Sequence, residues 1–379
     1  MTTATPAAGS AGSAGSASSA GSASSAGSAS SAGSAGSAGS AGSASSAGSA
    51  GSAGSAGSAG SAGSAGAGGS PTSAAEGALP GANGSPTSGA AGARSAAGEA
   101  LPDGKRFPAA PGLRRFSFNQ ATTQGWPLPD LVDALVRSGV PGIGLWREPV
   151  AEYGLEKTAR LVRDAGIAVT SLCRGGFFAD AGWYDDNRRA IDEATALGTS
   201  VLVLVSGGLG GRDLAGARAH VADAVGRLVP YARAAGVTLA IEALHPMFCS
   251  DRCVISTLEQ ALTIAERHDV GEVGVVIDTY HLWWDDRAPA LVRRAGPRVS
   301  AFQLADWITP LPAGVLTGRG MPGTGCVDLP AWVSYVDSAG YTGPIEIEVF
   351  NTEVWARPGA EVLAEAVEGY RAATERSAT

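Results

Sequence analysis

Acidic residues close several of the most apolar segments of this 379-residue chain. The run 275–277 is Val-Val-Ile, Asp278 follows it directly, and His281 comes three residues later. Such a run is typical of a strand buried on both faces, where an unpaired charge is costly. The carboxylate therefore indicates either a binding site at the end of the strand or a cap on the helix that follows.

Two other apolar runs carry acids at the same relative place. Glu242 closes the run 238–242, and Glu348 lies in the run 345–350. In parallel α/β proteins the carboxyl ends of the strands gather at one face, so we expect Glu242, Asp278 and Glu348 to converge. Three neighbouring carboxylates repel one another unless a cation lies between them.

The chemistry that this set favours is binding of a hard divalent ion. Oxygen ligands suit Mg2+ or Mn2+ better than Zn2+. Gln303 would add a neutral oxygen, because its alternation with Ala301 and Ala305 predicts that it faces the interior. The competing interpretation is a set of hydrogen-bonded acids in the core, paired with Arg147 or Arg174.

Short apolar runs and amphipathic stretches alternate eight times along the folded part of the sequence. The strand candidates are 115–119, 142–146, 168–173, 200–205, 238–242, 274–278, 300–304 and 345–350. The helical candidates include 129–137, 155–165, 186–197, 215–235 and 257–267. Glycines at 139, 166, 236 and 340 are placed to end helices in the left-handed conformation.

This alternation predicts an α/β fold with a parallel sheet and right-handed crossovers. Eight repeats in about 260 residues favour closure into a (β/α)8 TIM barrel over an open sheet. No Gly-x-Gly-x-x-Gly follows the first strand, so a nicotinamide-binding Rossmann fold lacks its fingerprint. The glycine-rich segment 206–211 indicates either a flexible loop or a cradle for a phosphate or sugar.

Residues 1–111 are Ser-Ala-Gly repeats followed by Gly/Ala/Pro/Ser-rich sequence with almost no large apolar side chains. We predict a disordered tail there and a barrel domain at 112–375. The tail lacks the features of a secretory signal, and no run of about 18 apolar residues predicts a membrane span. We therefore expect a cytoplasmic protein without a membrane partner.

Charge and cysteine content narrow the function further. The net charge of −8 disfavours non-specific binding to nucleic acid. The four cysteines fit neither a dense disulfide framework nor paired zinc knuckles. Cys249 and Cys253 are close enough in sequence to suspect a pair, but reduced thiols are the expected state.

Five motifs, in order, resemble the sugar phosphate isomerase/epimerase family, which has a xylose isomerase-like TIM barrel. The resemblance covers the whole folded part and is more specific for the superfamily than for the substrate. The motifs are Glu-Ala-Leu-His at 242–245, Asp-Thr-Tyr-His at 278–281, Phe-Gln-Leu-Ala-Asp-Trp at 302–307, Arg-Gly-Met-Pro-Gly-Thr-Gly at 319–325 and Ile-Glu-Ile-Glu-Val-Phe at 345–350.

The resemblance implies a divalent metal held by Glu242, Asp278, Gln303 and Glu348, with Mn2+ ahead of Mg2+ and Co2+. The usual third ligand of the family is a histidine, so Gln303 is a departure. It either binds through its amide oxygen, with weaker affinity and a preference for harder ions, or marks the loss of the metal. Glu346 lies one layer deeper and is expected to support the site.

The resemblance also assigns substrate contacts. His281 matches the histidine that contacts substrate, and Arg319 matches the loop arginine that holds a substrate oxygen or phosphate. Glu148 and Arg174 join them as candidate binding residues near the mouth, although an ion pair is the competing role for Glu148.

His245 is a further candidate binding residue, or else it orients Glu242. A wall of aromatic side chains is also expected at the mouth, where it would stack against a sugar face or an aglycone. Its candidate members are Trp126, Trp146, Trp283, Trp284 and Trp307.

The implied reaction is an isomerisation or epimerisation through an enediolate, with Glu242 and Glu348 moving the proton on opposite faces of the substrate. The substrate would be a sugar, sugar phosphate or cyclitol, and the family is compatible with a homo-oligomer. The tryptophan-rich mouth motivates a second hypothesis, a lyase or dehydratase that eliminates a β-substituent from a keto sugar or C-glycoside. Gln303 motivates a third, a non-catalytic ligand-binding barrel without metal.

Overall fold

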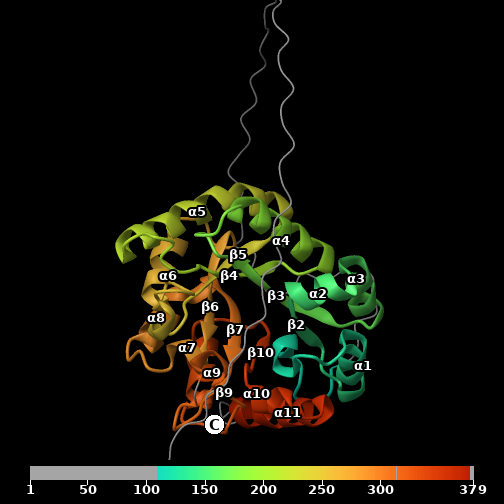
Figure 1. The fold of residues 1–379 in the computed structure, drawn as a ribbon. Coiled ribbons are helices and arrows are strands. Elements are labelled where there is room, and N and C mark those ends of the chain that lie inside the picture. Colours follow the sequence, from blue (N-terminus) through green and yellow to red (C-terminus); the bar gives the residue numbers. More distant parts are fainter. Residues whose placement is uncertain (1–108, 313, 376–379) are drawn as a thin grey trace, which may run out of the picture. The chain divides into compact units, whose positions relative to one another are not determined.

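The structure, a computed structural model, describes residues 109–312 and 314–375. All but the last three residues of the predicted tail, 1–111, lie outside the described residues, so its disorder stays a prediction. The limits 112–375 of the barrel domain stay a prediction as well. Within the described residues, helices surround a central barrel of strands (Figure 1).

Eight parallel strands close into a barrel, which confirms the predicted architecture. The order around the barrel is β1-β10-β7-β6-β5-β4-β3-β2, so β1 closes the ring between β2 and β10. The barrel strands are β1 (Phe116–Asn119), β2 (Gly142–Trp146), β3 (Ala168–Gly176), β4 (Val201–Val205), β5 (Thr238–Glu242), β6 (Val273–Asp278), β7 (Val299–Leu304) and β10 (Ile345–Ile347).

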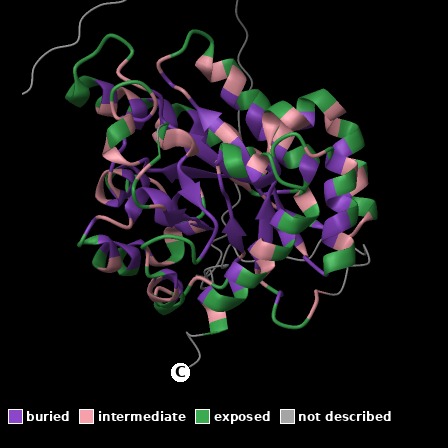
Figure 2. Cartoon of the chain, turned by 60° about the horizontal axis from the view of Figure 1, so that its bottom comes forward, coloured by how far each residue is buried: buried purple, intermediate pink, exposed green. Residues whose placement is uncertain are grey.

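The longer helices cover the outside of the barrel with one face buried and the other exposed, whereas α7 is buried on all sides (Figure 2). The helices are α1 (Leu128–Ser138), α2 (Arg147–Tyr153), α3 (Leu155–Asp164), α4 (Trp183–Leu197), α5 (Leu214–Ala235), α6 (Leu258–Ala265), α7 (Thr279–Leu282), α8 (Ala288–Ala295), α9 (Leu329–Ser338), α10 (Thr352–Trp355) and α11 (Gly359–Glu375). Short 3-10 turns occur at Gln120–Thr123, Pro246–Phe248, Gly296–Arg298 and Val315–Thr317.

Helix α1 illustrates how the sequence sets these elements. Leu128, Leu131 and Leu135 recur at three- and four-residue spacing and are buried, so one face of the helix packs on the barrel. Each such side chain contributes on the order of 1.5–3 kcal/mol. Pro129 lies in the first turn, where its missing N–H is tolerated. The helix ends at Gly139, whose φ of 67° is left-handed, as predicted.

A layer of small side chains fills the barrel below its mouth. Its buried members are Cys173, Val203, Ala240, Val276 and Ala301. Side chains two residues apart on a strand point to the same face. Glu242, Asp278 and Gln303 each follow a member of this layer by two residues, so the strands direct them inward at the mouth, as predicted for Gln303.

A short antiparallel ribbon, β8 (Asp306–Trp307) and β9 (Arg319–Gly320), follows β7. The sequence patterns do not predict it. Asp306 organises the segment after the ribbon, because its carboxylate accepts hydrogen bonds from the backbone N–H groups of Gly323 and Val327, each at 3.0 Å. The Asn351 side chain donates to the Arg319 carbonyl at 2.9 Å. These bonds fix the place of Arg319.

The last barrel strand is shorter than the predicted run 345–350, because regular pairing ends at Ile347. Beyond it, the backbone N–H of Val349 donates to the hydroxyl of Thr122 at 3.0 Å instead of to a neighbouring strand. Glu348 remains buried at the mouth although it lies outside the regular strand.

Candidate metal centre and active site

Three of the predicted site residues meet at the mouth of the barrel. Glu242 ends β5, Asp278 ends β6 and His281 lies in α7. Their exposed fractions are 6%, 1% and 2%. Their candidate ligand atoms all lie within 4.8 Å of one another. The group thus has the composition and spacing of a metal site.

Asp278 fulfils both roles that the sequence left open. Its Oδ1 accepts a hydrogen bond from the backbone N–H of Tyr280 at 2.8 Å and caps α7. Its Oδ2 points to the buried group, 2.8 Å from Arg319 Nη1. The cap holds the carboxylate in one orientation and leaves the second oxygen for the site.

Arg319 lies within the group. Its Nη1 is 2.8 Å from Asp278 Oδ2 and 3.0 Å from Glu348 Oε2. Its guanidinium lies 5.1 Å from the ring centre of Tyr280 and 5.4 Å from that of Phe350. The predicted substrate-binding arginine therefore bridges two of the predicted metal ligands.

Burial dominates the electrostatics of the site. It raises the pKa of Glu242 well above its usual range, and the charges of Asp278 and Glu348 raise it further. It also raises the pKa of Glu348 to about 8, against the opposing effect of Arg319. Burial disfavours the charged form of Arg319, but the carboxylates outweigh it and raise its pKa. When ionised, three carboxylates and one guanidinium leave two negative charges, which one divalent cation would balance.

Two buried oxygens test whether these residues fit a metal ion. Gln303 Oε1 and Glu348 Oε1 have no hydrogen-bond partner among the described residues. An unsatisfied buried polar group costs on the order of 1–3 kcal/mol and requires an explanation. A cation bound by both oxygens would explain why neither has a hydrogen-bond partner. Carboxylate and amide oxygens suit a hard ion. The chemistry of these donors fits the implied metal, although Glu348 lies outside the group of Glu242, Asp278 and His281, whose ligand atoms are within 4.8 Å of one another.

Glu346 supports the site from below. One of its oxygens accepts hydrogen bonds from Asn119 Nδ2 at 2.7 Å and Gln303 Nε2 at 3.1 Å. The other accepts from Thr170 Oγ1 and Ser171 Oγ, each at 2.9 Å. Because a carboxylate accepts hydrogen bonds, the Gln303 amide presents its NH2 group to Glu346. Its Oε1 is thereby left for another partner.

His281 is held by a backbone contact. Its Nδ1 accepts a hydrogen bond from the His245 backbone N–H at 3.1 Å, and its Nε2 lies 3.1 Å from Arg319 Nη2, so both ring nitrogens face donor groups. Nε2 lies 3.8 Å from Glu242 Oε1 and 3.9 Å from Asp278 Oδ2. Burial lowers the pKa of His281 to about 3. In the described structure His245 thus orients His281, and its side chain forms no hydrogen bond with Glu242.

Glu148 and Arg174 lie outside the buried group. Glu148 is exposed in the first turn of α2, and its Oε1 is 3.8 Å from Arg174 Nη2. Arg147 forms ion pairs with two acidic residues of α4. The buried carboxylates therefore pair with Arg319, and not with Arg147 or Arg174 as the competing interpretation required.

Part of the expected aromatic wall is present. The ring centre of Trp307 lies 4.9 Å from that of Tyr280 and 5.4 Å from that of Trp283. Trp126 instead packs against the start of α11, where a Cβ atom added to Gly359 would lie 2.2 Å from its ring. Trp307 and Trp283 are thus associated with the site, and Trp126 is a packing residue.

The glycine-rich segment 206–211 packs against the loop between β5 and α6. Leu209 donates its backbone N–H to the Ser250 carbonyl at 3.1 Å. A Cβ atom added to Gly208 would lie 2.7 Å from the backbone of Asp251. The close approach of two loops accounts for the glycine. All four cysteines are free, so Cys249 and Cys253 do not pair.

Sequence patterns missed several supporting residues. Asn119 accepts a hydrogen bond from Trp146 Nε1 at 3.0 Å, which fixes its amide so that Nδ2 faces Glu346. The polar pair Thr170-Ser171 inside the otherwise apolar third strand is a signal that could have indicated buried partners. Both residues donate to Glu346.

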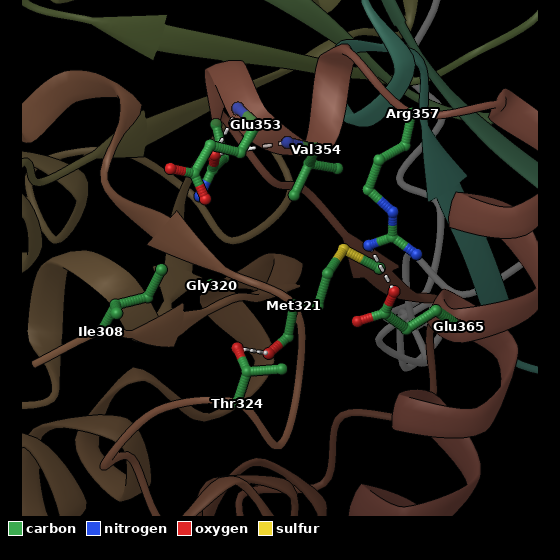
Figure 3. Close-up of a pocket in the computed structure, with 9 residues that line it drawn as sticks. Ile308, Gly320, Met321, Thr324, Glu353, Val354, Arg357 and Glu365 are labelled. Carbon is green, nitrogen blue, oxygen red and sulfur yellow. Dashed lines mark hydrogen bonds and ion pairs between the residues drawn. The ribbon is translucent and has the colours of Figure 1, made fainter. Parts of the chain in front are cut away.

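A cavity of about 190 Å3 lies beside the site, and the buried carboxylates Glu242, Asp278 and Glu348 do not line it. Met321 and Val354 line it, together with the ion pair between Arg357 and Glu365 at 2.6 Å (Figure 3). Gly320, directly after Arg319, also lines it. The cavity therefore borders the ribbon that carries Arg319. None of the described helices is both long and apolar enough to cross a membrane.

The closed barrel defines the class of protein, a (β/α)8 barrel. Its buried polar group lies at the carboxyl ends of the strands, where active sites of such barrels occur. Residues 132–372 match the family described as xylose isomerase-like TIM barrel. That match covers more than half of the chain, and the chain belongs to this family.

Named relatives span more than one reaction. The 3-dehydroshikimate dehydratase of Pseudomonas aeruginosa is 28% identical over 260 residues, which cover 64% of this chain and 39% of that protein. The inosose isomerase of Bacillus subtilis is 28% identical over 145 residues, or 37% of this chain and 50% of that protein. The matches thus span half or less of these relatives.

A protein of Sinorhizobium meliloti with a solved crystal structure is 43% identical to this chain. The TM-score is 0.67, and the alignment covers 69% of this chain and 99% of that one. The shared region has the length of the barrel without the tail.

Proposed function

We propose that this protein is a divalent-metal-dependent isomerase or epimerase of a sugar, sugar phosphate or cyclitol. Its main support is the group of buried carboxylates Glu242, Asp278 and Glu348, for which Arg319 supplies only one positive charge. An isomerase and a dehydratase among the relatives support enzymatic activity of this kind.

Glu242, Asp278, Gln303 and Glu348 would hold the ion, with Mn2+ preferred over Mg2+ and Co2+ as the cofactor. The unpartnered oxygens of Gln303 and Glu348 support this ligand set. A bound cation would supply Lewis-acid polarisation of adjacent substrate oxygens, which acidifies the C–H bond between them. Glu346 would keep the amide oxygen of Gln303 available to the ion.

Glu242 and Glu348 would carry the proton. One carboxylate removes the α-proton of the substrate, and the other returns a proton to the opposite face or to the neighbouring carbon. The first outcome is epimerisation and the second is isomerisation. His281, which burial keeps neutral, would contact a substrate oxygen. Arg319 would balance the charge that develops.

The test combines metal analysis with proton exchange. Purified protein is loaded with Mn2+, stripped of excess ion and analysed for metal content. Candidate ketoses and inososes are then incubated with it in deuterated water, and NMR measures deuterium at the α-carbon. We expect one ion per chain and exchange that a chelator abolishes. A protein that retains no stoichiometric ion, or exchanges no α-proton of any candidate, contradicts the proposal.

A dehydratase is the second candidate function. The 3-dehydroshikimate dehydratase match, which covers most of the barrel, favours it. The aromatic side chains of Trp283 and Trp307 near the site also favour it, since they would pack against an unsaturated ring product. Mass spectrometry distinguishes the two, because elimination releases water or another group and isomerisation conserves mass.

A metal-free ligand-binding barrel is favoured by one observation, the position of Arg319 between Asp278 and Glu348. When Glu242, Asp278 and Glu348 are all ionised, the single charge of Arg319 leaves two negative charges, which is why we propose the metal enzyme. The metal analysis separates these functions, because a stoichiometric ion excludes the metal-free barrel.

A further inference from the structure

Arg174 presents an unsatisfied cation at the mouth of the barrel. Its guanidinium lies 4.0 Å from the ring centre of Phe177 and 5.9 Å from that of Trp146. Its Nε is buried and has no hydrogen-bond partner in the described part of the chain. Its contact with Glu148 is 3.8 Å long and largely exposed, and such a pair contributes little.

Arg252 approaches the same region from the loop between β5 and α6. Its backbone N–H donates to the Phe248 carbonyl at 3.1 Å, and the Phe248 ring lies perpendicular to the His281 ring with 6.0 Å between the centres. Gly208 lets the neighbouring loop pack directly against Asp251. The loop that carries Arg252 thus lies beside His281 through Phe248.

The loop that carries Arg252 lies beside the segment that carries Arg174, because Cys253 pairs with Gly207, where an added Cβ atom would lie 3.1 Å from the backbone of Phe177. Burial lowers the pKa of Arg174, and the positive charge of Arg252 lowers it further. Burial also lowers the pKa of His281, to which the charge of Arg252 contributes. Within the described residues, neither the half-buried Arg252 nor its neighbour Asp251 takes part in an ion pair. Among the described residues, Arg174 thus has one distant counter-ion, Glu148, and Arg252 has none.

We propose that Arg174 and Arg252 form a subsite for an anionic group on the substrate, a carboxylate or a phosphate. This inference rests on the proposed function and narrows its substrate class. The buried group with one divalent ion is already neutral, so a substrate anion has no partner there. Arginine donors form paired, charge-assisted hydrogen bonds with both kinds of anion.

The test compares matched probes on the Mn2+-loaded full chain by isothermal titration calorimetry. D-Fructose 6-phosphate is paired with D-fructose, and 3-dehydroshikimate is paired with its methyl ester. We expect the charged member of at least one pair to bind about 10- to 100-fold more tightly than its neutral partner. The pair that shows this preference identifies phosphate or carboxylate as the anion.

Arg174→Gln and Arg252→Gln should each bring the ratio of charged-probe to neutral-probe affinity to within about threefold of one. Arg252→Lys should retain part of the preference for the charged probe, because the charge remains. Arg160→Gln is the matched control, since Arg160 is exposed on α3 and pairs only with Glu156; it should change neither affinity. Raising the salt concentration should weaken only the charged probe in the wild-type protein.

Equal affinities within both pairs, or a preference that survives both glutamine variants, overturns the subsite. This outcome is distinct from failure of the proposed function, which is measured by α-proton exchange and metal content. If the α-proton of a neutral probe exchanges, but charged and neutral probes bind equally well, the proposed isomerase is supported and the anion subsite is contradicted. The salt dependence of the wild-type protein keeps the test decisive if a variant does not fold.

Discussion

Glu346 and Glu348 lie two residues apart and point into the same barrel, with exposed fractions of 3% and 2%. Four side-chain donors surround Glu346, from β1, β3 and β7. Glu348 has one cationic partner, Arg319, and one oxygen without a partner. Two chemically identical groups thus occupy opposite environments within one short segment.

The difference separates a structural carboxylate from a functional one. Every hydrogen bond to Glu346 stabilises the fold, because its donors would otherwise be buried without an acceptor. Glu348 contributes much less to the fold, and its free oxygen and the raised pKa suit it to bind an ion or move a proton. Burial alone therefore does not indicate an active-site acid, and burial without sufficient partners is what supports the proposed role of Glu348.

Glu348→Gln should give the largest effect, on activity alone. It removes a proton-transfer group and a charged ligand, so α-proton exchange should fall about 10²- to 10⁴-fold. The free energy of unfolding of the metal-free protein should change by less than about 1 kcal/mol, because the amide is isosteric. NMR exchange and urea denaturation measure the two quantities. Full activity in this variant would remove Glu348 from the mechanism.

Glu346→Leu should do the reverse and destabilise the protein. Its donors would lose their acceptor, at a total cost of about 2 to 4 kcal/mol by the usual penalty for buried unsatisfied groups. Urea denaturation of metal-free protein measures it. Glu368→Leu on the exposed face of α11 is the control and should stay within about 0.5 kcal/mol. Equal stability of the two variants contradicts a structural role for Glu346.

Gln303→His should shift the metal preference of the site toward Zn2+, because imidazole is a softer ligand than an amide oxygen. We expect the ratio of Zn2+ to Mn2+ affinity to rise about 10- to 100-fold, the size of effects seen around metal ligands. Competition titrations with a chromophoric chelator measure the ratio. An unchanged ratio would indicate that Gln303 does not touch the ion.

Gly144→Ala tests the space reserved for Glu346. An added Cβ atom would lie 2.6 Å from the Glu346 carboxylate, so we expect a loss of about 1 to 3 kcal/mol from overpacking. Gly226→Ala in α5 is the matched control, because its Cβ atom would meet only His268 Cε1 at 3.7 Å. Thermal denaturation should show that variant unchanged or slightly stabilised. A Gly144→Ala variant at least as stable as the Gly226→Ala variant would contradict close packing of Glu346 against Gly144.

We expect the smallest effect on stability at Asp186, an exposed acid that differs from the buried Glu346 and Glu348. The Arg147 hydrogen bonds lower its pKa to about 2, against the effect of its partial burial. Its stabilisation is thus fully present above the unfolded-state pKa near 4 and is lost as the pH falls through about 2. Solvent screening keeps it below about 1 kcal/mol. Asp186→Asn should flatten the pH dependence of unfolding in that window.

Much of the fold follows from local patterns. The apolar runs that end in Asp278 and Glu242 are barrel strands because such runs can be buried only in a parallel sheet covered by helices. The left-handed φ of Gly139 follows from its place after a helix. The ribbon β8–β9 does not follow, because two-residue strands carry no alternation that a sequence can reveal.

The site is predictable only in part for a similar reason. The acids are visible in sequence because each interrupts an apolar run. Asn119 is not visible in this way, because it reaches Glu346 through a tertiary contact across 227 residues, and Arg319 is indicated only by the family resemblance. Arg252 carries no sequence signal, because only the packing of two loops brings its segment beside the site.

The loops after β4 and β5 are joined by backbone hydrogen bonds from Leu209 to Ser250 and from Val254 to Gly207. A change in the backbone of one loop would disturb the other, so we expect the two loops to vary together among related barrels. Engineering of new specificity by grafting should therefore exchange both segments together. A chimaera that replaces only the loop after β4 or only the loop after β5 would lose the backbone hydrogen bonds between the two loops.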